Sequence, residues 1–540
     1  MHRNDDSGEP VALSRGQQLA LALGGVLGAA WLSGVPEMHQ VYSKSGSPVY
    51  LVVLPWLVGL VVVLAVAAIV VRLARTDPRS GGLAWWAQDR SGRVVGTIIN
   101  AGLFTMYAGN PPAGALVAVL ALDRTFEGVT LSYPRSDGGF ALTGGGALAA
   151  WAVLSGLFAI HVVGARLMLR LNLALSVAKA VLLVALVLSA ASVHYLILPA
   201  PTGADQDMAL TMLIPVITAA GMMFAFTGFQ GPVDNGDKAG KEHRGFAIYG
   251  ALIIATVIYL LLQLVYTVGV HDAWRAPEPG SPESLLVAVV SVLSPLTNAL
   301  LFIYLAAIVL KTSADQSVLK LPRLTMRSSL QVLFVVYLFG VAVLVLMTSL
   351  GDWSEITDAK SVIYLFVYSY AAVAYQASWK AEMFPGPRGG RLLAPVSFVV
   401  STVIAFYTGF ITLLWAYALM AVVAAAMFWS RRSETDRNRA EHLRRARWLL
   451  GYFAVLLALA WCHLVIRYLL SDPTSKEEGR PEFVEFMLGR EDLFRFEDPL
   501  LYGITAVALA VAAGAAGLLF HRVGVREAES FIRLKNRSDA

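Results

Sequence analysis

Apolar stretches long enough to cross a lipid bilayer recur along the whole of this chain. A transmembrane helix needs about 20 mostly apolar residues to cross a hydrocarbon core of about 30 Å. The 540 residues, 57% of them hydrophobic, contain fourteen such stretches, at 17–36, 50–72, 94–121, 141–163, 167–194, 209–232, 246–270, 284–310, 329–350, 361–379, 393–408, 410–430, 448–470 and 499–521. The sequence therefore predicts an all-α polytopic membrane protein rather than a soluble enzyme.

The distribution of lysine and arginine predicts how these spans are oriented. Segments rich in Lys and Arg are retained on the cytoplasmic side during insertion. Basic residues fall mostly in alternate segments, including the one before the first span, with Arg3 and Arg15, and the one that carries Lys238, Lys241 and Arg244. The alternation predicts fourteen spans in the plasma (inner) membrane with both termini in the cytoplasm.

The chain is predicted to consist of two sets of five spans followed by four further spans. In order, the parts are a cytoplasmic tail at 1–16, spans one to five at 17–194, spans six to ten at 209–379, spans eleven and twelve at 393–430, a basic cytoplasmic segment at 431–447, spans thirteen and fourteen at 448–521 with an outer loop at 471–498, and a cytoplasmic tail at 522–540. The basic segment is expected to form a helix at the membrane surface, with a regulatory docking site as the alternative.

Several classes of function lack their usual sequence signals. No inner loop is long enough for a nucleotide-binding domain, and Gly240-Lys241 lacks the upstream glycine and the following hydroxyl of a phosphate-binding loop. The nine histidines show no His-Glu-x-x-His spacing, and the single cysteine, Cys462, lies within a span, so no metal site is expected. The net charge of +5 follows from the basic inner loops, so nucleic-acid binding is not expected. The sequence thus predicts a transporter that uses no cofactor and draws its energy from a gradient.

Two spans carry glycine-rich interruptions at matching positions. Span one contains Gly24-Gly25-Val26-Leu27-Gly28-Ala29-Ala30-Trp31, and span six, five spans later, contains the stretch 221–229. In transporters with inverted repeats, the substrate binds where two such helices lose regular geometry near the middle of the bilayer. Exposed amides suit a carboxylate and exposed carbonyls suit an ammonium, so the pair predicts a site for a zwitterion. Gly24 and Gly28 would also fit an ordinary helix-packing face, but packing motifs have no reason to follow a five-span offset.

Four motifs resemble those of the amino acid-polyamine-organocation (APC) family of transporters. They are the interrupted span one, Pro78-Arg79-Ser80-Gly81-Gly82 after span two, the run from Gly164-Ala165-Arg166 through Asn172 to Lys179 in span five, and Phe224-Ala225-Phe226-Thr227-Gly228-Phe229-Gln230 in span six. The motifs lie in register over about residues 17 to 430, whereas spans thirteen and fourteen fall outside them.

The resemblance implies a LeuT-like core of two inverted five-helix repeats with additional C-terminal transmembrane helices. It also implies proton-coupled uptake or exchange of amino acids or related amines. The amides near Ala29 and Ala30 in the turn of span one would hold the substrate carboxylate, and Gly28 would belong to the same substrate-binding site. The carbonyls that would hold the substrate ammonium belong to Val26, Phe224, Ala225 and Thr227. Phe226 would lie beside the pocket as a gate.

Lys179 lies deep in span five, about eight residues inside the boundary that Arg170 marks, or roughly 12 Å at the helical rise. A lysine at the centre of a membrane costs about 2.5 to 3.5 kcal/mol on insertion scales, and desolvation favours its neutral form. The resemblance adds that a lysine of the fifth helix reaches the broken first helix in proton-coupled relatives. We therefore expect Lys179 to be the proton-coupling residue. The alternative is a permanently charged lysine that pins the structure or reaches water.

Two further residues are candidates for a pocket or a gate. Asn110 precedes Pro111-Pro112 in span three, where it either lines the pocket or serves the proline kink. Tyr368 in span ten either contributes to a gate or is simply packed.

The leading hypothesis is a proton-coupled symporter of neutral amino acids that works by alternating access in the lipid bilayer. Neutral substrates are favoured because no acidic residue lies deep in spans one to ten to attract a cationic side chain. An amino acid or amine exchanger is the alternative within transport. A non-transporting amino acid sensor or accessory subunit on the same fold is the alternative of another class. The sequence does not indicate an oligomeric state.

Overall fold

A computed structural model describes residues 13–29, 31–32, 34–36, 38–39, 52–125, 130–134, 140–193, 225–238, 240–267, 282–320, 328–350, 354–383, 390–430, 439–470 and 499–539. In chain order the elements are α1 (Arg15–Val26), α3 (Leu54–Thr76), α4 (Gly82–Thr125), β1 (Ser132–Pro134), β2 (Phe140–Leu142), α5 (Gly144–Val163), α6 (Ala165–Val193), α10 (Gly231–Asp234), α11 (Lys241–Val265), α13 (Pro282–Asp315), α14 (Ser328–Leu350), α15 (Ser354–Lys380), α16 (Gly390–Tyr407), α17 (Phe410–Ser430), α18 (Arg439–Leu469) and α20 (Pro499–Asp539).

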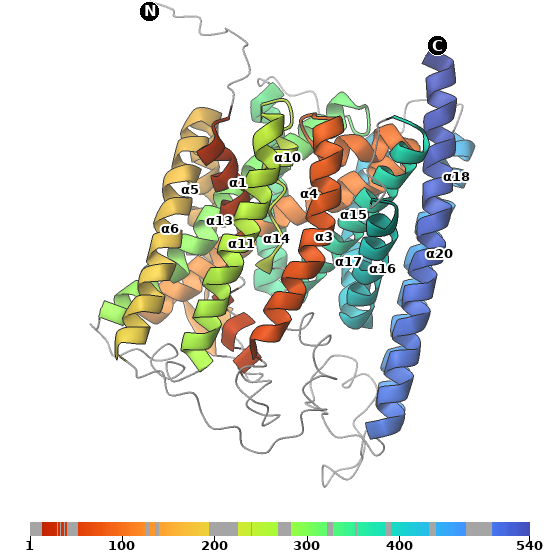
Figure 1. Ribbon diagram of the computed structural model, residues 1–540. Helices are drawn as coiled ribbons and strands as arrows, with labels where there is room; N and C mark the ends of the chain where they lie inside the picture. Colours follow the sequence, from red (N-terminus) through yellow and green to blue (C-terminus); the bar gives the residue numbers. More distant parts are fainter. Residues whose placement is uncertain are drawn as a thin grey trace, which may run out of the picture.

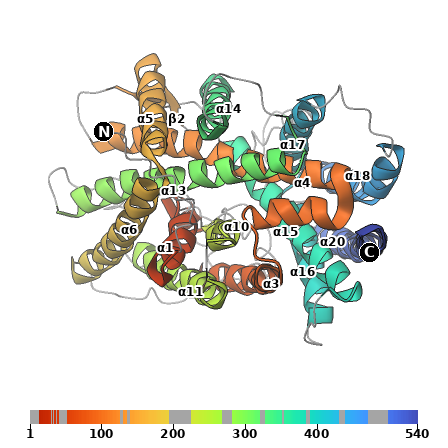
Figure 2. The ribbon, with the colours of Figure 1, turned by 90° about the horizontal axis from the view of Figure 1, so that it is seen from above.

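The helices form one bundle in which the two short helices α1 and α10 lie near the centre (Figures 1 and 2). α1 packs against α6, α10, α11 and α13, and α10 also contacts α3 and α4. The long helices α4 and α13 cross beside them and share the most extensive helix–helix contact of the described chain. The two short helices are therefore held on all sides by longer ones, which fixes where their ends lie.

Ten of the described helices are long and apolar enough to cross a membrane, namely α3, α4, α5, α6, α11, α13, α14, α17, α18 and α20. Each coincides with a predicted span. Span ten forms α15, and span eleven forms a shorter apolar helix at Arg391–Tyr407. Span one is interrupted after Val26, and most of span six lies outside the described residues. Large apolar side chains on the outer faces are exposed, as expected where helices contact lipid, including those of Val61, Leu188, Val422 and Val511.

Helix α4 begins well before the predicted start of span three at 94. Its first part, from Gly82, carries Asp89 and Arg90, and these charges excluded it from a hydropathy-based span. The helix changes direction at Gly92, whose φ of 79° lies in the left-handed region that favours glycine. The predicted span is therefore only the later, membrane-crossing part of a longer helix.

One short antiparallel hairpin departs from the all-α prediction. β1 pairs with β2 in the register Ser132 to Leu142 and Pro134 to Phe140, between the end of α4 and the start of α5. Thr143 then caps α5, because its hydroxyl accepts a hydrogen bond of 3.1 Å from the Gly146 amide. The hairpin occupies a connection between spans, so it does not alter the helical architecture of the bundle.

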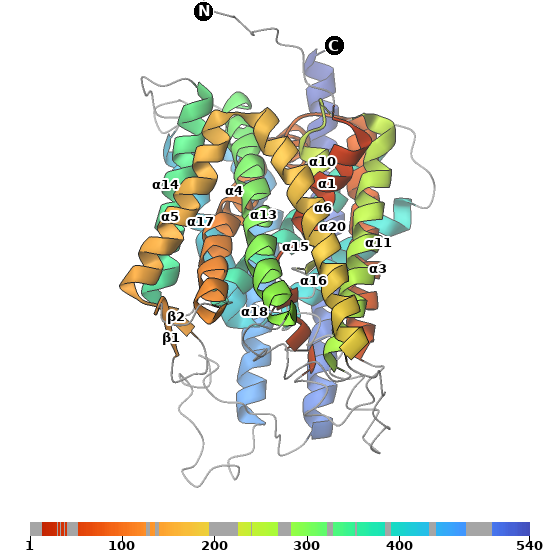
Figure 3. The ribbon, with the colours of Figure 1, turned by 90° about the vertical axis from the view of Figure 1, so that its left-hand side faces the viewer.

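α1 begins and α20 ends at the same end of the bundle (Figures 1 and 3). α20 is one continuous helix that extends through most of the predicted tail at 522–540 and packs on α4, α15, α16 and α18. α18 includes the later part of the predicted basic segment at 431–447. Residues 431–438 and the predicted outer loop at 471–498 lie outside the described residues.

Candidate functional site

Helix α1 stops at Val26, inside the stretch where the sequence predicts an interruption. Ser14 starts the helix with a capping box, in which its hydroxyl accepts from the Gln17 amide and its own amide donates to the Gln17 side chain. At the other end, the Gly28 amide donates to the Val26 carbonyl at 2.8 Å instead of continuing the helical pattern. The carbonyls around the break are thereby left without their usual helical partners and need other donors.

The second interruption lies at the described end of span six. Residues 226–230 form turns between Ala225 and the short helix α10, and Gly228 has a φ of 97°. A Cβ on Gly25 would lie 2.3 Å from the Gly228 carbonyl oxygen, which leaves no room for a side chain. The two interruptions therefore meet backbone to backbone, and only glycine fits at the contact.

Side chains from neighbouring helices supply donors to the carbonyls of the α1 break. On α6, the Lys179 ammonium donates to the Gly24 carbonyl at 3.0 Å. On α13, the Asn298 amide donates to the Gly25 carbonyl at 2.8 Å, and the Ser294 hydroxyl lies 2.8 Å from the Gly28 carbonyl and 3.2 Å from the Leu27 carbonyl. The break is thus built into the polar structure of the bundle, and Lys179 is one of the groups that hold it.

Tyr259 on α11 joins the two interruptions directly. Its hydroxyl lies 2.6 Å from the Val26 carbonyl oxygen and 3.3 Å from the Ala225 carbonyl oxygen. These are two of the carbonyls that the resemblance assigns to the substrate ammonium. An ammonium at that position would have to share these acceptors with the tyrosine hydroxyl or displace it. Tyr259 was not identified from the sequence, because an isolated tyrosine in an apolar span carries no local signal.

The side chain of Phe226 lies in an aromatic group next to Tyr259. It makes edge contacts with Trp56 and Tyr259, with ring centroids 6.2 and 6.0 Å apart, and it is fully buried. Gly59 on α3 makes room for it, since a Cβ there would lie 3.0 Å from the Phe226 ring. Phe226 therefore lies beside the break, which is where a gating role would place it.

The other predicted pocket residues lie along α15 and α4. The Tyr368 hydroxyl donates to the Gln230 side chain at 2.9 Å, and its ring stacks on Phe229 with centroids 5.3 Å apart. The Asn110 amide donates to the Met106 carbonyl of its own helix at 2.6 Å, one turn before the two prolines. Tyr368 thus contacts the span-six interruption directly, whereas the described hydrogen bond of Asn110 stabilises the kinked helix.

Ala30 and Phe224, the two remaining predicted substrate ligands, lie outside the described residues. Val26, Gly28, Ala29, Ala225 and Thr227 all lie at the two interruptions. No metal centre is apparent within the described part of the chain, where no group of three or more His, Cys, Asp or Glu side chains is close enough to hold an ion.

Residues 13–477 match the family model described as amino acid permease. The chain belongs to this family. Two curated proteins of Bacillus subtilis (strain 168) are similar to it. The aspartate-proton symporter is 21% identical over 486 residues, which is 82% of this chain and 88% of the relative. The glutamate/serine transporter AimA is 24% identical over 265 residues, which is 47% of each chain. The family is one of transporters, so the chain is a multi-pass transporter rather than an enzyme.

Solved structures share the fold of the permease. A crystal structure of a mutant manganese transporter from Eremococcus coleocola matches with a TM-score of 0.50 at 13% identity, covering 80% of the permease and 98% of the other chain. At that identity the likeness shows the shared fold alone.

A buried carboxylate lies directly after the second interruption of the permease. Asp234 is fully buried at the end of α10, and the Tyr107 hydroxyl on α4 donates to its Oδ2 at 2.6 Å. The next residue, Asn235, accepts a hydrogen bond from the Tyr304 hydroxyl at 2.6 Å. The predicted span six ends at 232, so Asp234 lies just outside the spans that the sequence analysis considered. The expectation of neutral substrates stays a prediction.

The end of the permease bundle where α1 begins is closed by contacts between connecting segments. The Gly81 amide donates to the Asp234 carbonyl at 2.8 Å, and the Leu13 amide donates to the Lys238 carbonyl at 2.9 Å. Arg244, also buried, donates to the carbonyls of Ala74 and Gly236. Gly81 has a φ of 69°, and a Cβ there would lie 2.2 Å from the Thr312 hydroxyl. The glycine of the Pro-Arg-Ser-Gly-Gly motif is thus required for this closure.

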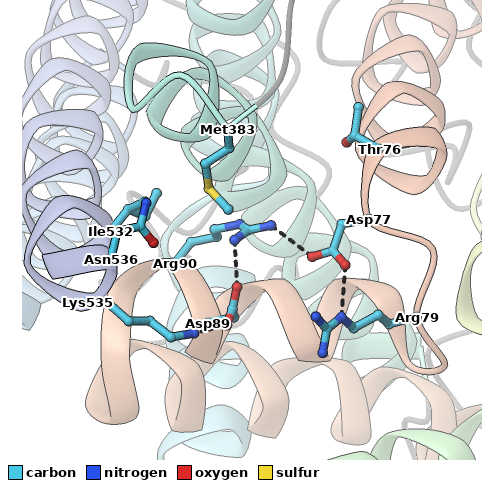
Figure 4. Close-up of a pocket in the computed structure, with 9 residues that line it drawn as sticks. All are labelled: Thr76, Asp77, Arg79, Asp89, Arg90, Met383, Ile532, Lys535 and Asn536. Carbon is cyan, nitrogen blue, oxygen red and sulfur yellow. Dashed lines mark hydrogen bonds and ion pairs between the residues drawn. The ribbon is translucent and has the colours of Figure 1, made fainter. Parts of the chain in front are cut away.

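A polar pocket of about 290 Å³ lies at the same end, between the start of α4 and the last turns of α20 (Figure 4). Arg90 lies between two carboxylates, 2.8 Å from Asp77 and 2.6 Å from Asp89. Asp89 also pairs with Lys535 of α20, and Asp77 pairs with Arg79. The C-terminal helix is thereby tied electrostatically to the connection between α3 and α4.

Proposed function

We propose that the permease is a proton-coupled symporter that moves α-amino acids across the plasma (inner) membrane by alternating access. The proposal includes fourteen spans, a core of two inverted five-helix repeats and cytoplasmic termini. The end of the bundle closed by Gly81, Arg244 and Lys238 would then be the cytoplasmic end, so the described conformation would be closed to the cytoplasm.

The observation that carries the proposal is the hydrogen bond between Lys179 and Gly24. Lys179 is fully buried, and two polar residues on the same face of α6, Asn172 and Ser176, donate to the Ala20 carbonyl of α1 at 3.2 and 3.4 Å. One face of α6 is therefore hydrogen-bonded to the last turns of α1. Loss of a proton from the ammonium would weaken its hold on the Gly24 carbonyl, because a neutral amine is a poorer donor than a charged one. Protonation would thus be linked to the position of the α1 break.

Similarity to named transporters supports the same proposal. One relative is an aspartate-proton symporter and another is a glutamate/serine transporter, so the substrates in both names are α-amino acids. The shared α-amino and α-carboxylate groups suit the carbonyls and amides at the two interruptions.

The proposal is tested with Lys179→Gln in proteoliposomes. Wild-type protein is expected to accumulate an amino acid when a pH gradient is imposed, acid outside. Lys179→Gln is expected to lose this accumulation while still exchanging internal for external substrate, because glutamine can donate to the Gly24 carbonyl but cannot carry the proton. Lys311→Gln, at an exposed position on α13, is the matched control and should behave as wild type.

Three outcomes would contradict parts of the proposal. Accumulation by Lys179→Gln in response to a pH gradient would remove the coupling role of that residue. Wild-type exchange without any response to pH would identify an exchanger. Binding of an amino acid without flux would identify a sensor.

A further inference from the structure

One carboxyl group of the permease is buried inside the closed end of the bundle. Asp234 is fully buried at the end of α10, and its Oδ2 accepts the hydrogen bond of 2.6 Å from the Tyr107 hydroxyl. Its other oxygen, Oδ1, is also buried and accepts no hydrogen bond from any described residue, although the Leu83 amide in the first turn of α4 is placed to stabilise a negative charge. An ionised carboxylate is poorly satisfied here, because burial without a compensating charge disfavours the charged form.

The titratable groups that face Asp234 are phenols rather than cations. Tyr107 on α4 and both Tyr364 and Tyr368 on α15 lie close enough to interact with its charge. Within the described chain Asp234 forms no ion pair, so a proton is the group best placed to neutralise it. The charged or titratable groups on the other helices packed against α10, and on its own segment, have other contacts: Tyr304 of α13 with Asn235, Arg244 of α11 with the Ala74 and Gly236 carbonyls, Asp77 after α3 with Arg79 and Arg90, Arg15 of α1 with the Phe246 ring, and the exposed Asp237 with Arg244.

The backbone of Asp234 belongs to the contact that closes this end of the bundle. Its carbonyl accepts hydrogen bonds from the Gly81 amide at 2.8 Å and from the Ser80 hydroxyl at 3.4 Å. A Cβ on Gly236 would collide with the Arg79 backbone, so the two connecting segments are in direct contact. A movement that parts these segments therefore displaces Asp234 and admits water to its carboxyl group.

We propose that Asp234 is a second proton-binding site of the permease and must be protonated for the cytoplasmic end to stay closed. This inference goes beyond the coupling role of Lys179, and it rests on the transport function and orientation proposed above. Ionisation leaves a poorly satisfied charge in the closed form, whereas water solvates the carboxylate in the open form, so ionisation favours opening. An alkaline cytoplasm would open this end and an acid cytoplasm would keep it closed. A transporter that carries protons inward would thus slow as the cytoplasm acidifies.

The test measures how readily a buried position beside the closure becomes accessible as the pH changes. Thr312 is buried against Gly81, so a cysteine at this position should react with a maleimide only when the end opens. Thr312→Cys is combined with Cys462→Ser, which removes the exposed native thiol, and the purified protein is labelled in detergent between about pH 5 and about pH 8. Lys311→Cys, at the exposed neighbouring position, corrects for the effect of pH on thiol reactivity.

The ratio of the two labelling rates should rise by about tenfold as the pH increases, if the closed form binds the proton about ten times more tightly than the open form. Asp234→Asn should keep the ratio low at every pH, because the amide stays neutral and can still accept the hydrogen bond from Tyr107. Tyr107→Phe should retain the rise, since the carboxyl group is kept. His243→Gln removes a titratable side chain in the first turn of α11 and should also retain it.

Two results would overturn the role of Asp234. One is a labelling ratio that does not change with pH while Asp234 is present, and the other is an Asp234→Asn protein whose ratio rises as before. If Asp234→Asn does not fold, Asp234→Ser provides a second neutral variant. A rise that disappears in His243→Gln would assign the switch to the histidine instead.

Labelling and flux separate this inference from the proposed function. A ratio that depends on pH through Asp234, in a protein that transports no amino acid, overturns the proposed function alone. A flat ratio in a protein that accumulates amino acids in response to a pH gradient overturns only the role of Asp234.

Discussion

The backbones of Gly25 and Gly228 are in direct contact, although 203 residues separate them in the sequence. A Cβ on Gly228 would lie 2.6 Å from the Gly25 carbonyl carbon, and one on Gly25 would lie 2.3 Å from the Gly228 carbonyl oxygen. Neither neighbour is a flexible side chain that could move aside. The two interrupted segments are therefore locked to each other at one point, and the rest of the site is organised around it.

We predict that Gly25→Ala abolishes uptake and lowers the free energy of unfolding by about 2 kcal/mol or more, since the added methyl must displace backbone. Gly228→Ala should be at least as damaging, because its φ of 97° also disfavours alanine. Gly156→Ala on α5 is the control, since nothing lies within 4 Å of a Cβ there. Thermal unfolding in detergent and uptake in proteoliposomes provide the measurements. Wild-type uptake by Gly25→Ala would show that the contact does not exist in the working protein.

A second prediction concerns Tyr259, because its hydroxyl lies within hydrogen-bonding distance of a carbonyl in each interruption. Tyr259→Phe leaves the buried Val26 and Ala225 carbonyls without this donor, which should cost about 1–3 kcal/mol of stability. Uptake should fall as well, since the two segments lose the hydroxyl that joins them. Tyr249→Phe, two turns or more away on the same helix α11, should have little effect on either property. Equal stability and uptake in Tyr259→Phe and wild type would contradict a bridging role.

Local sequence was sufficient to locate the interruptions. Gly28 and Gly228 lie where the two segments lose helical geometry, and the five-span offset pairs them, whereas Gly24 and Gly25 still belong to α1. The side chains that bind these segments were harder to predict from the sequence. Tyr259 lies 233 residues from Val26 and Ser294 lies 266 residues from Gly28, whose carbonyls they bind, and each is a common residue in an apolar span. Their position beside the break follows only from the way the helices pack in the structure.

The buried charges were missed for a different physical reason. Hydropathy windows place span ends where charged residues begin, so the predicted spans six and ten, at 209–232 and 361–379, leave out Asp234 and Lys360. In the structure, α15 begins at Ser354, before the predicted start at 361, and Lys360 is buried within the bundle. How deeply a residue is buried depends on its neighbours in the folded structure rather than on how apolar its neighbours in the sequence are. For the same reason, hydropathy did not predict the first part of α4, where Asp89 pairs with Arg90 and with Lys535 of α20.

The charged cluster between α4 and α20 allows a prediction about the C-terminal helix. The Arg90 side chain is 6% exposed and pairs with both Asp77 and Asp89, whereas the Lys535 side chain is 44% exposed and pairs with Asp89. Removing one partner from a buried ion pair costs about 3–5 kcal/mol, but an exposed pair contributes only about 0–1 kcal/mol. Arg90→Gln should therefore lower the thermal midpoint far more than Lys535→Gln.

The dependence on salt concentration further distinguishes the contribution of Arg90 to stability from that of Lys535. Raising the ionic strength should reduce the small effect of Lys535→Gln, because exposed charges are screened, and should leave the effect of Arg90→Gln nearly unchanged. Thermal unfolding of the two variants and wild type at low and high salt provides the measurement. If Lys535→Gln destabilises the permease as much as Arg90→Gln does, then the pairing with α20, rather than the bridge between the two aspartates, holds this end of the bundle together.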